Sequence, residues 1–520
     1  MNNYRMRLSG LACGLFLLMS SWASAQQKYW ITFKDKPVYS ANTWISPQAE
    51  QNRMQQGLAV YQDTDAPVNP AYIRQLKDLG IETQVTSKWL NATSAYLDEK
   101  QLQAVKKLHF VQEINGIDSR LRICSVTDGQ LTPEIYSVVL NQIGAKAFIE
   151  EGLTGKGIKV GIIDVGFYGV ATSASLQLIR DENRIKDTRD FVNPSHTEDF
   201  FSMETHSDYH GAEVLQLVGG YNTNQRMEFG MATGATFYLA RTDHGVRETR
   251  TEEDNWIAAI ERMDSLGVRL INTSLGYAMG FSNAKENYKP SEMDGKTSKI
   301  SKAAQIAADQ KGMLIVVSAG NEGDDPNWRI ISTPADAQGV LSIGATKAKS
   351  RDRISYSSIG PDFLPYLKPN VSCFSPNGTS FSAPVITGLA ACLMEKNPKL
   401  TNKQLMRIIE KSAHLYPYGN TYIGYGVPDA RKALQLVKDS TAKVNTIQEI
   451  HTSNKSYEVQ TSDPDAERAV IFHKKTAQVV SKQEVLALVN SRLTLHRQSD
   501  EKRTTVDLGS EVIEIFWKDK

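Results

Sequence analysis

The sequence predicts an α/β protein. Its central domain is a doubly wound, mostly parallel sheet with helices on both faces, preceded by a small α+β domain and followed by a small, mostly β domain. Strand-like and helix-like segments alternate between residues 131 and 437, as a parallel sheet with crossover helices requires. The preceding segment has a β-α-β-β-α-β order, and residues 440–520 contain mainly short alternating runs.

The N-terminus has the three parts of a secretory signal. Arg5 and Arg7 precede an apolar run at 8–19, and the small residues Ala23-Ser24-Ala25 follow as a cleavage site. The run is too short to span a membrane, and no later stretch reaches the roughly 18 apolar residues that a membrane helix needs. We therefore expect residues 1–25 to be removed on export to the periplasm, the cell envelope or the outside.

Residues 26–120 are predicted to form a small ferredoxin-like domain. Alternating side chains predict strands at 29–34, 81–85, 95–97 and 110–114. Helical spacing is marked by two apolar sets, Tyr72, Ile73, Leu76 and Leu79 before Gly80, and then Leu102, Val105 and Leu108. The polar stretch 40–70 contains no predicted element.

Residues 121–438 contain the alternating segments of the central domain. Strands are predicted at 159–163, 236–240, 268–272, 314–317 and 340–343, and helices from His210, at 252–266, at 299–311 and from Ser380. Thr401 and Gln404 form a capping box that begins a late helix. In the C-terminal region, Tyr457–Val459, 469–472 and 511–516 suggest strands, and Val485, Leu486 and Val489 suggest a short helix.

Ser380 stands before an almost wholly apolar run that carries no charge until Glu395. A helix that is apolar on all sides is a buried helix, and Pro384 is tolerated because it falls in the first turn. We therefore expect Ser380 at the N-terminus of a buried helix. There, unpaired backbone N–H groups and the helix dipole favour negative charge.

The segment Gly378-Thr379-Ser380-Phe381-Ser382-Ala383-Pro384 resembles the nucleophile segment of the subtilisin-like serine proteases (subtilases, peptidase family S8). Asp164, at the end of an apolar strand, and His210, at the start of a helix, fit the same family in the same chain order. The resemblance implies that Ser380 is the nucleophile, His210 its base and Asp164 the carboxylate that orients the base. The histidine segment departs from the family, since Ala212 and Glu213 replace its usual Thr and second His.

Two strand ends extend the resemblance. Asn321 follows the strand at 313–317, and the resemblance implies that its amide binds the oxyanion together with the Ser380 N–H. The strand at 270–272 runs into Ser274-Leu275-Gly276, which resembles the family segment that pairs with the substrate backbone. Substrate binding is therefore expected at Ser274, Leu275, Gly276, Ala319 and Gly320. The segment 424–430 resembles the end of the family's catalytic domain.

No cofactor is expected. The polar cluster of His196, Glu204, His206, Asp208 and His210 includes histidines four residues apart, a spacing that can bind zinc on a helix. The cluster has neither an apolar helical stripe nor the His-Glu-x-x-His pattern, so we expect no catalytic metal. The resemblance leaves structural calcium open, although no acidic loop indicates it.

Composition restricts the partners. With 59 basic and 58 acidic residues the formal net charge is +1, which argues against a nucleic-acid partner. The expected partners are protein or peptide substrates and the chain's own propeptide. Cys124, Cys373 and Cys392 remain after the signal, and three cysteines cannot all pair within one chain. A Cys124–Cys373 bridge stays open.

The sequence as a whole predicts an exported serine endopeptidase made as a zymogen. Residues 26–120 resemble the inhibitory propeptide of subtilases in arrangement, with processing expected within 118–129. The alternative is a permanent accessory domain. Residues 439–520 are interpreted as a secretion or docking module. A catalytically silent, protease-like binding protein is the alternative function. A serine esterase would need a Gly-x-Ser-x-Gly elbow and the order Ser, Asp, His, and the chain has neither.

Overall fold

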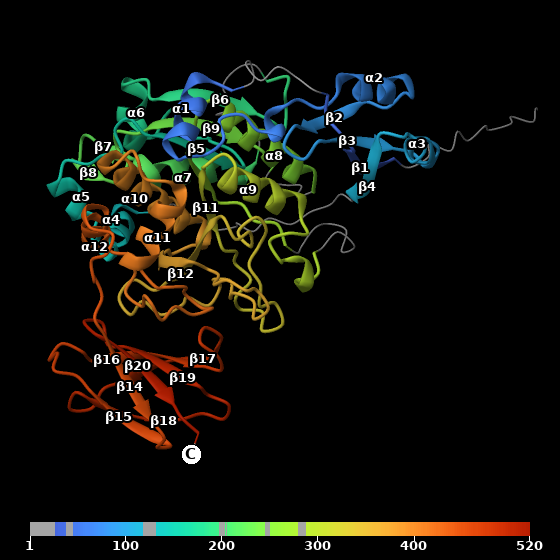
Figure 1. Cartoon of the computed structure of the whole chain (residues 1–520). Helices are drawn as coiled ribbons and strands as arrows, with labels where there is room; N and C mark the ends of the chain where they lie inside the picture. Colours follow the sequence, from blue (N-terminus) through green and yellow to red (C-terminus); the bar gives the residue numbers. More distant parts are fainter. Residues whose placement is uncertain are drawn as a thin grey trace, which may run out of the picture.

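The computed structural model describes residues 26–37, 45–117, 132–196, 203, 205–244, 250–278 and 288–519. The expected signal at 1–25 and the expected processing segment at 118–129, with Cys124, lie outside the described residues. Figure 1 shows an N-terminal domain in blue, a central domain in teal to orange and a C-terminal domain in red.

The N-terminal domain has the predicted ferredoxin-like arrangement. Its sheet has the order β2-β3-β1-β4, and neighbouring strands are antiparallel. A helix connects β1 to β2 and another connects β3 to β4, as in a β-α-β-β-α-β unit. The elements are β1 (Gln27–Phe33), α1 (Pro47–Gln55), α2 (Pro70–Asp78), β2 (Thr83–Ser87), β3 (Ala92–Leu97), α3 (Glu99–Val105) and β4 (Val111–Ile117).

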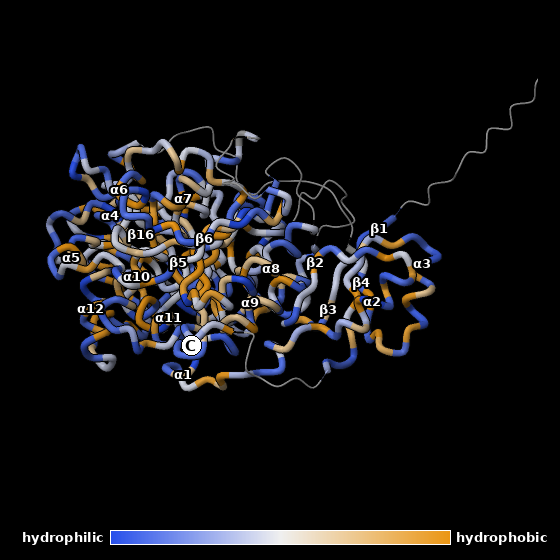
Figure 2. Tube along the Cα trace, turned by 90° about the horizontal axis from the view of Figure 1, so that it is seen from above, coloured by the Kyte–Doolittle hydropathy of each residue, from blue (hydrophilic) through white to orange (hydrophobic). Residues whose placement is uncertain are grey.

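Helix α1 is an addition that the sequence did not predict. It lies in the polar stretch 40–70, begins at the N-cap Ser46 and buries Ala49, Asn52 and Arg53. In Figure 1 it lies over the central domain, away from the β1–β4 sheet, and Figure 2 shows the same separation from above. The stretch therefore extends the N-terminal domain across the surface of its neighbour.

The central domain has the predicted alternation of strands and helices around one sheet. The sheet has the order β13-β12-β11-β10-β5-β9-β6, and its neighbouring strands are parallel. The elements are α4 (Pro133–Gln142), α5 (Lys146–Glu150), β5 (Lys159–Asp164), α6 (Gln177–Asp181), β6 (Ile185–Asp190), α7 (His210–Gly219), β7 (Tyr221–Asn222), β8 (Met227–Glu228), β9 (Thr236–Arg241), α8 (Arg250–Ser265), β10 (Leu270–Thr273), α9 (Lys299–Asp309), β11 (Leu314–Ser318), β12 (Leu341–Thr346), β13 (Val371–Phe374), α10 (Ala383–Lys396), α11 (Asn402–Ser412) and α12 (Ala430–Lys438). Strands β6 and β13 were not predicted.

Successive residues of the central strands belong to two different cores. Leu270 and Val316 pack with α7 and α10, whereas Ile271 and Val317 pack with α8 and α9. Side chains alternate between the two faces of a strand, so a sheet covered on both faces needs continuously apolar strands. Figure 2 shows apolar segments concentrated in the interior around β5.

The order of the strands reverses beside β5. The chain first builds β6 and β9 on one side of β5 and then β10, β11, β12 and β13 on the other. At such a point the loops that follow neighbouring strands turn away from each other, which opens a crevice at the carboxyl ends of the strands. Asp164 ends β5 and Ser274 follows β10, so both lie at this crevice.

The C-terminal domain is entirely β within the described residues. Its elements are β14 (Ile447–Thr452), β15 (Ser456–Gln460), β16 (Arg468–Lys474), β17 (Val480–Ala487), β18 (Arg492–His496), β19 (Arg503–Asp507) and β20 (Val512–Trp517). The helix suggested by Val485, Leu486 and Val489 is wrong. Val485 and Leu486 belong to β17, opposite Val470 and Ala469 of β16. Pairing with β16 therefore determines the local structure.

The β1–β4 sheet packs against α8 and α9. Lys28 on β1 lies 2.6 Å from Asp254 of α8, and both side chains are buried. Glu261 of α8 accepts a hydrogen bond from the Ser87 hydroxyl at 2.5 Å and from the backbone N–H of Trp89 at 3.2 Å. The propeptide-like sheet is thus held by carboxylates on one helix of the central domain.

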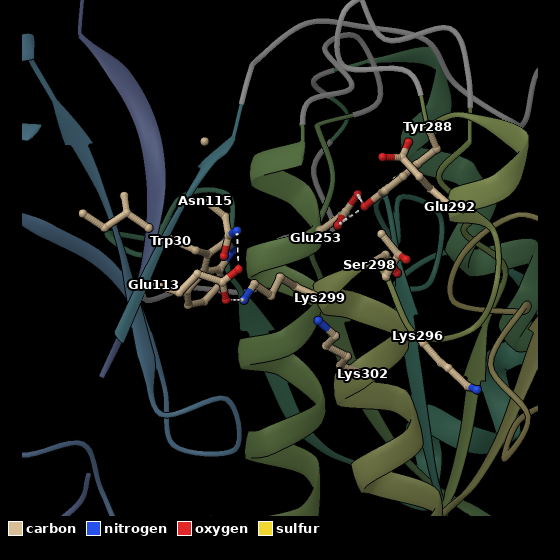
Figure 3. A pocket seen from close by; sticks show the side chains of 13 residues that line it. Trp30, Glu113, Asn115, Glu253, Tyr288, Glu292, Lys296, Ser298, Lys299 and Lys302 are labelled. Atoms are coloured by element: carbon tan, nitrogen blue, oxygen red, sulfur yellow. Dashed lines mark hydrogen bonds and ion pairs between the residues drawn. The ribbon is translucent and has the colours of Figure 1, made fainter. Parts of the chain in front are cut away.

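A cavity of about 590 Å³ remains between β4 and the N-terminal ends of α8 and α9. Figure 3 shows Glu113 and Asn115 on one side and Glu253, Tyr288 and Lys299 on the other. A 3.7 Å ion pair between Lys299 and Glu113 crosses it. No candidate catalytic residue lines this cavity, so it belongs to the interface between the two domains.

We predict that Lys474→Met destabilises the C-terminal domain. The ammonium of Lys474 lies 2.6 Å from Glu514, and neither side chain is exposed. Removing one partner would leave a buried, unpaired carboxylate, which costs about 3–5 kcal/mol. Chemical denaturation of the full chain should show an earlier transition, whereas Lys475→Met, at an exposed neighbouring position, should leave it in place. Equal transitions for the two variants would contradict the prediction.

Candidate active site

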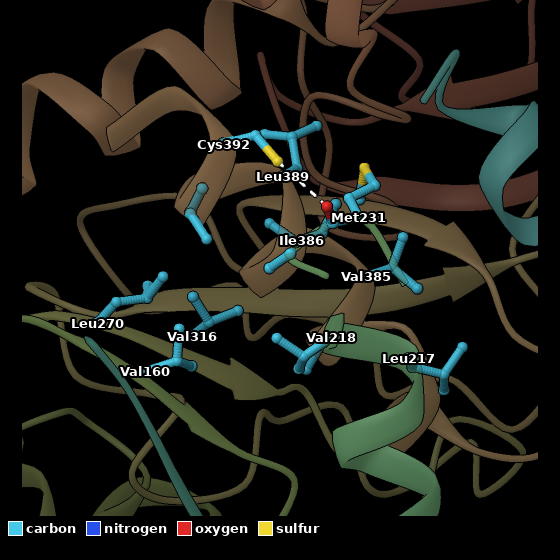
Figure 4. Packing of buried hydrophobic residues seen from close by; sticks show 14 of the residues in the cluster. Val160, Leu217, Val218, Met231, Leu270, Val316, Val385, Ile386, Leu389 and Cys392 are labelled. Carbon is cyan, nitrogen blue, oxygen red and sulfur yellow. Dashed lines mark hydrogen bonds between the residues drawn. The ribbon is translucent and has the colours of Figure 1, made fainter. Parts of the chain in front are cut away.

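Helix α10 places the Ser380 segment over the sheet. Its residues Val385, Ile386 and Leu389 pack in one core with Leu270 and Val316 of the underlying strands. Figure 4 shows this packing, with α7 alongside. The helix begins at Ala383, so Ser380 lies in the preceding 3₁₀ turn, Thr379–Phe381, and not in the helix itself as expected. Pro384 occupies the first turn of α10, as predicted.

Asp164 and His210 form a buried hydrogen-bonded pair. The Nδ1 atom of His210 lies 2.7 Å from Oδ1 of Asp164, and the two side chains are 7% and 0% exposed. Asp164 Oδ1 also accepts the Val165 N–H at 2.8 Å. An ionised carboxylate at this distance fixes Nδ1 as the protonated nitrogen, which leaves Nε2 available as a base.

Two glycines allow α7 to approach the loop after Asp164. Gly211 donates its N–H to the Gly166 carbonyl at 2.9 Å. A Cβ on Gly211 would lie 2.3 Å from that carbonyl oxygen, and one on Gly166 would lie 2.8 Å from the Asp208 Cα. Only the absence of a side chain permits this contact, and the contact brings His210 to the end of β5.

The environment of His210 favours its charged form. Burial alone would lower the pKa of the imidazole, but the charge and hydrogen bond of Asp164 outweigh burial, and the pKa is raised. The carboxylates of Glu213 and Asp243 contribute in the same direction. Glu213, the departure from the family pattern, therefore adds negative charge beside the His210 imidazole. Burial in turn raises the pKa of Glu213.

The turn that contains Ser380 contacts His210 through Phe381, and the Ser380 hydroxyl is hydrogen-bonded elsewhere. The His210 ring lies 5.2 Å, centroid to centroid, from the ring of Phe381, the residue after Ser380. The Ser380 hydroxyl donates to the Ser274 carbonyl at 3.1 Å, and the Ser274 hydroxyl donates to the Ser380 carbonyl at 2.7 Å. His210 Nε2 is buried and has no hydrogen-bond partner among the described residues.

Asn321 is oriented by Thr379. Its Oδ1 accepts the Thr379 N–H at 2.8 Å and the Thr379 hydroxyl at 2.9 Å. The amide nitrogen consequently lies on the side of Gly378, 3.2 Å from where a Cβ on that glycine would be. Gly378 has φ +88°, a conformation that favours glycine. Asn321 is thus held against the segment that carries Ser380.

The predicted substrate-binding residues lie on two segments that follow neighbouring strands. Ser274, Leu275 and Gly276 follow β10, and Ala319 and Gly320 follow its parallel neighbour β11. Ser332 lies between them. A Cβ on Gly276 would be 2.8 Å from its Cβ, and one on Gly320 would be 2.4 Å from its hydroxyl. The Ser332 hydroxyl is buried and has no hydrogen-bond partner among the described residues, so a polar group lies close to both segments.

The structure places parts of the polar histidine cluster, for which no metal was expected, in other interactions. His196 Nδ1 lies 3.2 Å from Asp190, and Asp208 accepts the Thr205 N–H at 2.6 Å. Glu204 and the side chain of His206 lie outside the described residues. Among the side chains that are described, no group of three or more His, Cys, Asp or Glu could hold a metal ion.

Cys373 and Cys392 are free and buried, and burial raises the pKa of both thiols. Thiols of this kind are unreactive, because the thiolate is the reactive form. Cys124, the third cysteine, is not among the described residues.

Three residues that contact the candidate site residues or act on their charge were not predicted from the sequence. Thr379 was noted only as part of the motif, although it fixes Asn321. Ser332 was not recognised, because it lies 58 residues after Ser274 in the chain, and only the fold brings it close to the segments 274–276 and 319–320. Asp243 was also missed. It is 3% exposed, accepts a hydrogen bond from Tyr277 at 2.9 Å and acts on the pKa of His210. Its position two residues after β9, at the carboxyl edge of the sheet, is a signal that could have identified it.

Comparison with models of known protein families identifies the family to which this chain belongs. A family model described as the subtilase family, peptidase S8, matches residues 155–431, which contain all nine predicted site residues. The chain belongs to the subtilase family. A second model, the peptidase S8 propeptide domain of Bacteroidota, matches residues 28–129.

Individual relatives agree with this assignment. Subtilisin NAT of Bacillus subtilis subsp. natto is 26% identical over 373 residues, which are 69% of this chain and 85% of that protein. Subtilisin E of Bacillus subtilis (strain 168) gives the same figures. A crystal structure of the epidermin leader peptide processing serine protease EpiP from Staphylococcus aureus has a TM-score of 0.54 at 16% identity, covering 81% of this chain and all of that chain. That structure supports the fold alone.

The protein is therefore a serine endopeptidase of the subtilase family that carries a propeptide domain. The predicted family, fold class and enzyme class are confirmed. No helix in the described part of the chain is long and apolar enough to cross a membrane.

We predict that the acid limb of kcat/KM lies above the ordinary imidazole pKa of about 6.5 and that Glu213→Gln moves it to lower pH. A base must be neutral, so activity falls as the pH drops through its raised pKa. Glu213→Gln removes a charge that favours the imidazolium. Glu467→Gln, an exposed change in the C-terminal domain, is the control. An unchanged acid limb in Glu213→Gln would show that Glu213 does not act on the base.

Proposed function

We propose that the protein is an exported serine endopeptidase, synthesised as a zymogen, that hydrolyses peptide bonds through Asp164, His210 and Ser380. In this proposal residues 1–25 are the signal peptide, 26–120 the inhibitory propeptide, 121–438 the peptidase domain and 439–520 a secretion or docking domain. The observation that carries the catalytic part is the buried 2.7 Å pair of Asp164 and His210 beside the Ser380 turn.

The proposed reaction begins with a small change at Ser380. Rotation about its Cα–Cβ bond would move the hydroxyl from the Ser274 carbonyl toward His210 Nε2, and such rotations are fast. Oγ then attacks the carbonyl carbon of the scissile bond while Nε2 takes its proton. Asp164 stabilises the resulting imidazolium. Release of the amine, with the proton returned from His210, leaves an acyl-enzyme, and water attacks it by the same steps in reverse.

Asn321 and the backbone N–H of Ser380 are the proposed oxyanion donors. The amide of Asn321 is already oriented by two hydrogen bonds from Thr379. A donor fixed in advance stabilises the developing charge without reorganisation at the moment of reaction. Protein or peptide substrates would lie along 274–276, with a side chain between that segment and Ala319-Gly320. No step of this mechanism uses a metal or cofactor.

The zymogen part of the proposal rests on the N-terminal domain. It matches a propeptide model and packs on α8 and α9 of the peptidase domain. Its last strand, β4, ends at Ile117, immediately before the segment where processing is expected. Export is supported by the signal-like sequence at 1–25.

We predict that Ser380→Ala abolishes both casein hydrolysis and processing of the propeptide. The unmutated enzyme should show a mature N-terminus within or close to 118–129 by mass spectrometry, and Ser380→Ala should keep the N-terminal domain attached. Ser355→Ala, at an exposed serine, is the control. Equal casein hydrolysis by the unmutated chain and Ser380→Ala would exclude Ser380 as the nucleophile. Active enzyme that still begins near Gln26 would exclude the propeptide role.

We predict that Asn321→Ala lowers kcat by about 10²–10³-fold, the range found when one oxyanion donor is removed from subtilisin itself. KM should change little, because the interaction is made in the transition state. The exposed Asn327→Ala serves as the control. A loss confined to KM would instead assign Asn321 to ground-state binding.

A further inference from the structure

The C-terminal domain shares an apolar core with the central domain. Two residues that follow α11 and four on the strands of the C-terminal domain form one buried cluster: Leu415, Ile423, Val470, Phe472, Val480 and Val512. In Figure 1 the C-terminal domain lies below β12, beside yellow and orange loops of the central domain. Domains move relative to one another unless a hydrophobic interface joins them, so we expect this domain to keep one position on its neighbour.

Hydrogen bonds at the edge of this core bind the loop between β12 and β13. The Arg351 guanidinium donates to the Asp507 carboxylate at 2.7 Å and to the Gly509 carbonyl at 2.7 Å. The backbone N–H of Arg353 donates to Oε1 of Gln483, which lies on β17, at 3.0 Å. The C-terminal domain therefore binds this loop both through a side chain and through its backbone.

The Arg353 side chain binds the backbone of the residues that follow it. Its guanidinium donates to the Ser355 carbonyl at 2.7 Å and to the Ser357 carbonyl at 2.6 Å. The guanidinium carbon lies 5.0 Å from the centre of the Tyr422 ring, a distance at which a cation and an aromatic ring attract each other. The conformation of this part of the loop therefore depends on Arg353.

The next residues of the loop pair with the turn that contains Asn321. Ser358 donates its N–H to the Gly320 carbonyl at 3.0 Å. Gly323 donates its N–H to the Tyr356 carbonyl at 2.8 Å. These two hydrogen bonds lie on either side of Asn321 in the chain, so the loop fixes the backbone that carries the amide.

Arg353 also lies against this turn directly. A Cβ on Gly323 would be 1.8 Å from the Ser357 carbonyl oxygen and 2.4 Å from Nη1 of Arg353. The absence of a side chain at Gly323 therefore allows the loop and the guanidinium to approach the turn. Between them, the Ser358 hydroxyl accepts the Glu322 N–H at 3.2 Å.

We propose that Arg353 is a positioning residue for the oxyanion donor Asn321 and that the C-terminal domain fixes Arg353 through Gln483. The inference rests on the proposed role of Asn321, and it gives residues 439–520 a role in positioning the site in addition to secretion or docking. Thr379 orients the amide of Asn321, whereas Arg353 fixes the backbone that carries it. An oxyanion donor is effective when it is held in place before the reaction, and a displacement of about 1 Å is costly.

Hydrogen exchange tests the positioning itself. The full chain with Ser380→Ala is used, so that self-cleavage does not alter the sample, and the peptide spanning 319–324 is followed by mass spectrometry. Arg353→Met should speed exchange in this peptide by about tenfold, because the acceptors of two of its N–H groups are no longer fixed. Gln483→Ala should speed it by about threefold, since one hydrogen bond to Arg353 is lost.

Steady-state kinetics test whether this support acts through Asn321. The substrate is a fluorogenic peptide copied from a casein site that the enzyme cuts, and active sites are counted with a fluorophosphonate so that inactive protein does not enter kcat. Arg353→Met should lower kcat by about tenfold with little change in KM, because the oxyanion forms only in the transition state. In the Asn321→Ala background the same change should cost about twofold or less, as expected when one residue acts through the other.

Matched variants serve as controls. Arg468→Met removes an exposed arginine from the C-terminal domain, and Gln478→Ala removes an exposed glutamine shortly before β17. Both should leave the exchange at 319–324 and kcat unchanged. If Arg353→Met fails to fold, judged by circular dichroism, Gln483→Ala replaces it in both experiments, with about a threefold loss of kcat expected.

Three outcomes would overturn the proposal. The first is exchange in Arg353→Met and Gln483→Ala equal to that in their controls. The second is an unchanged kcat in Arg353→Met, and the third is an equal loss of kcat with and without Asn321→Ala. The exchange experiment does not depend on catalysis, whereas failure of the proposed peptidase function would appear as equal casein hydrolysis by the unmutated chain and Ser380→Ala.

Discussion

The hydrogen bond between Asp164 and His210 is the contact on which the arrangement of the site depends. It joins the last residue of β5 to the first residue of α7 at 2.7 Å, in surroundings that exclude water. The contact forms only if α7 approaches the end of β5 closely, and the absence of side chains at Gly166 and Gly211 allows this approach. The parallel sheet positions the other candidate residues, because it brings the carboxyl ends of β5, β10 and β11 to one edge.

The parts that the sequence predicted are those whose cause is local. Apolar runs mark the central strands because both faces of the sheet are covered, and the capping box at Thr401 and Gln404 begins α11 where expected. The candidate site residues were predicted because each lies at or after the end of a strand or near the start of a helix, within a short motif. The pairing of Asp164 with His210 could be expected from chain order, but not the hydrogen bond that turns the Ser380 hydroxyl to Ser274.

The parts that the sequence did not predict are determined by distant partners. Residues 480–487 form a strand because β16 offers a pairing edge, whereas their apolar spacing alone favoured a helix. Helix α1 lacks an apolar stripe, since most of its buried residues are polar and are satisfied by groups more than 200 positions away. Ser332 likewise reaches the segments 274–276 and 319–320 only through the fold. Tertiary context of this kind leaves no periodic signal.

The proposed release of the N-terminal domain would give helix α8 both a covered and an uncovered state, and its residues suit both. Asp254, Glu261 and Asp264 are each met by the N-terminal domain, through Lys28, the 87–89 turn and Arg53. Burial raises the pKa of all three carboxyls, because removing their charged forms from water costs free energy. Their partners on the N-terminal domain offset this cost in the covered state. After such a release, water would solvate the same carboxylates. An apolar stripe would instead remain as an exposed patch prone to association. A surface that binds through charges can therefore release its partner and still be stable in water.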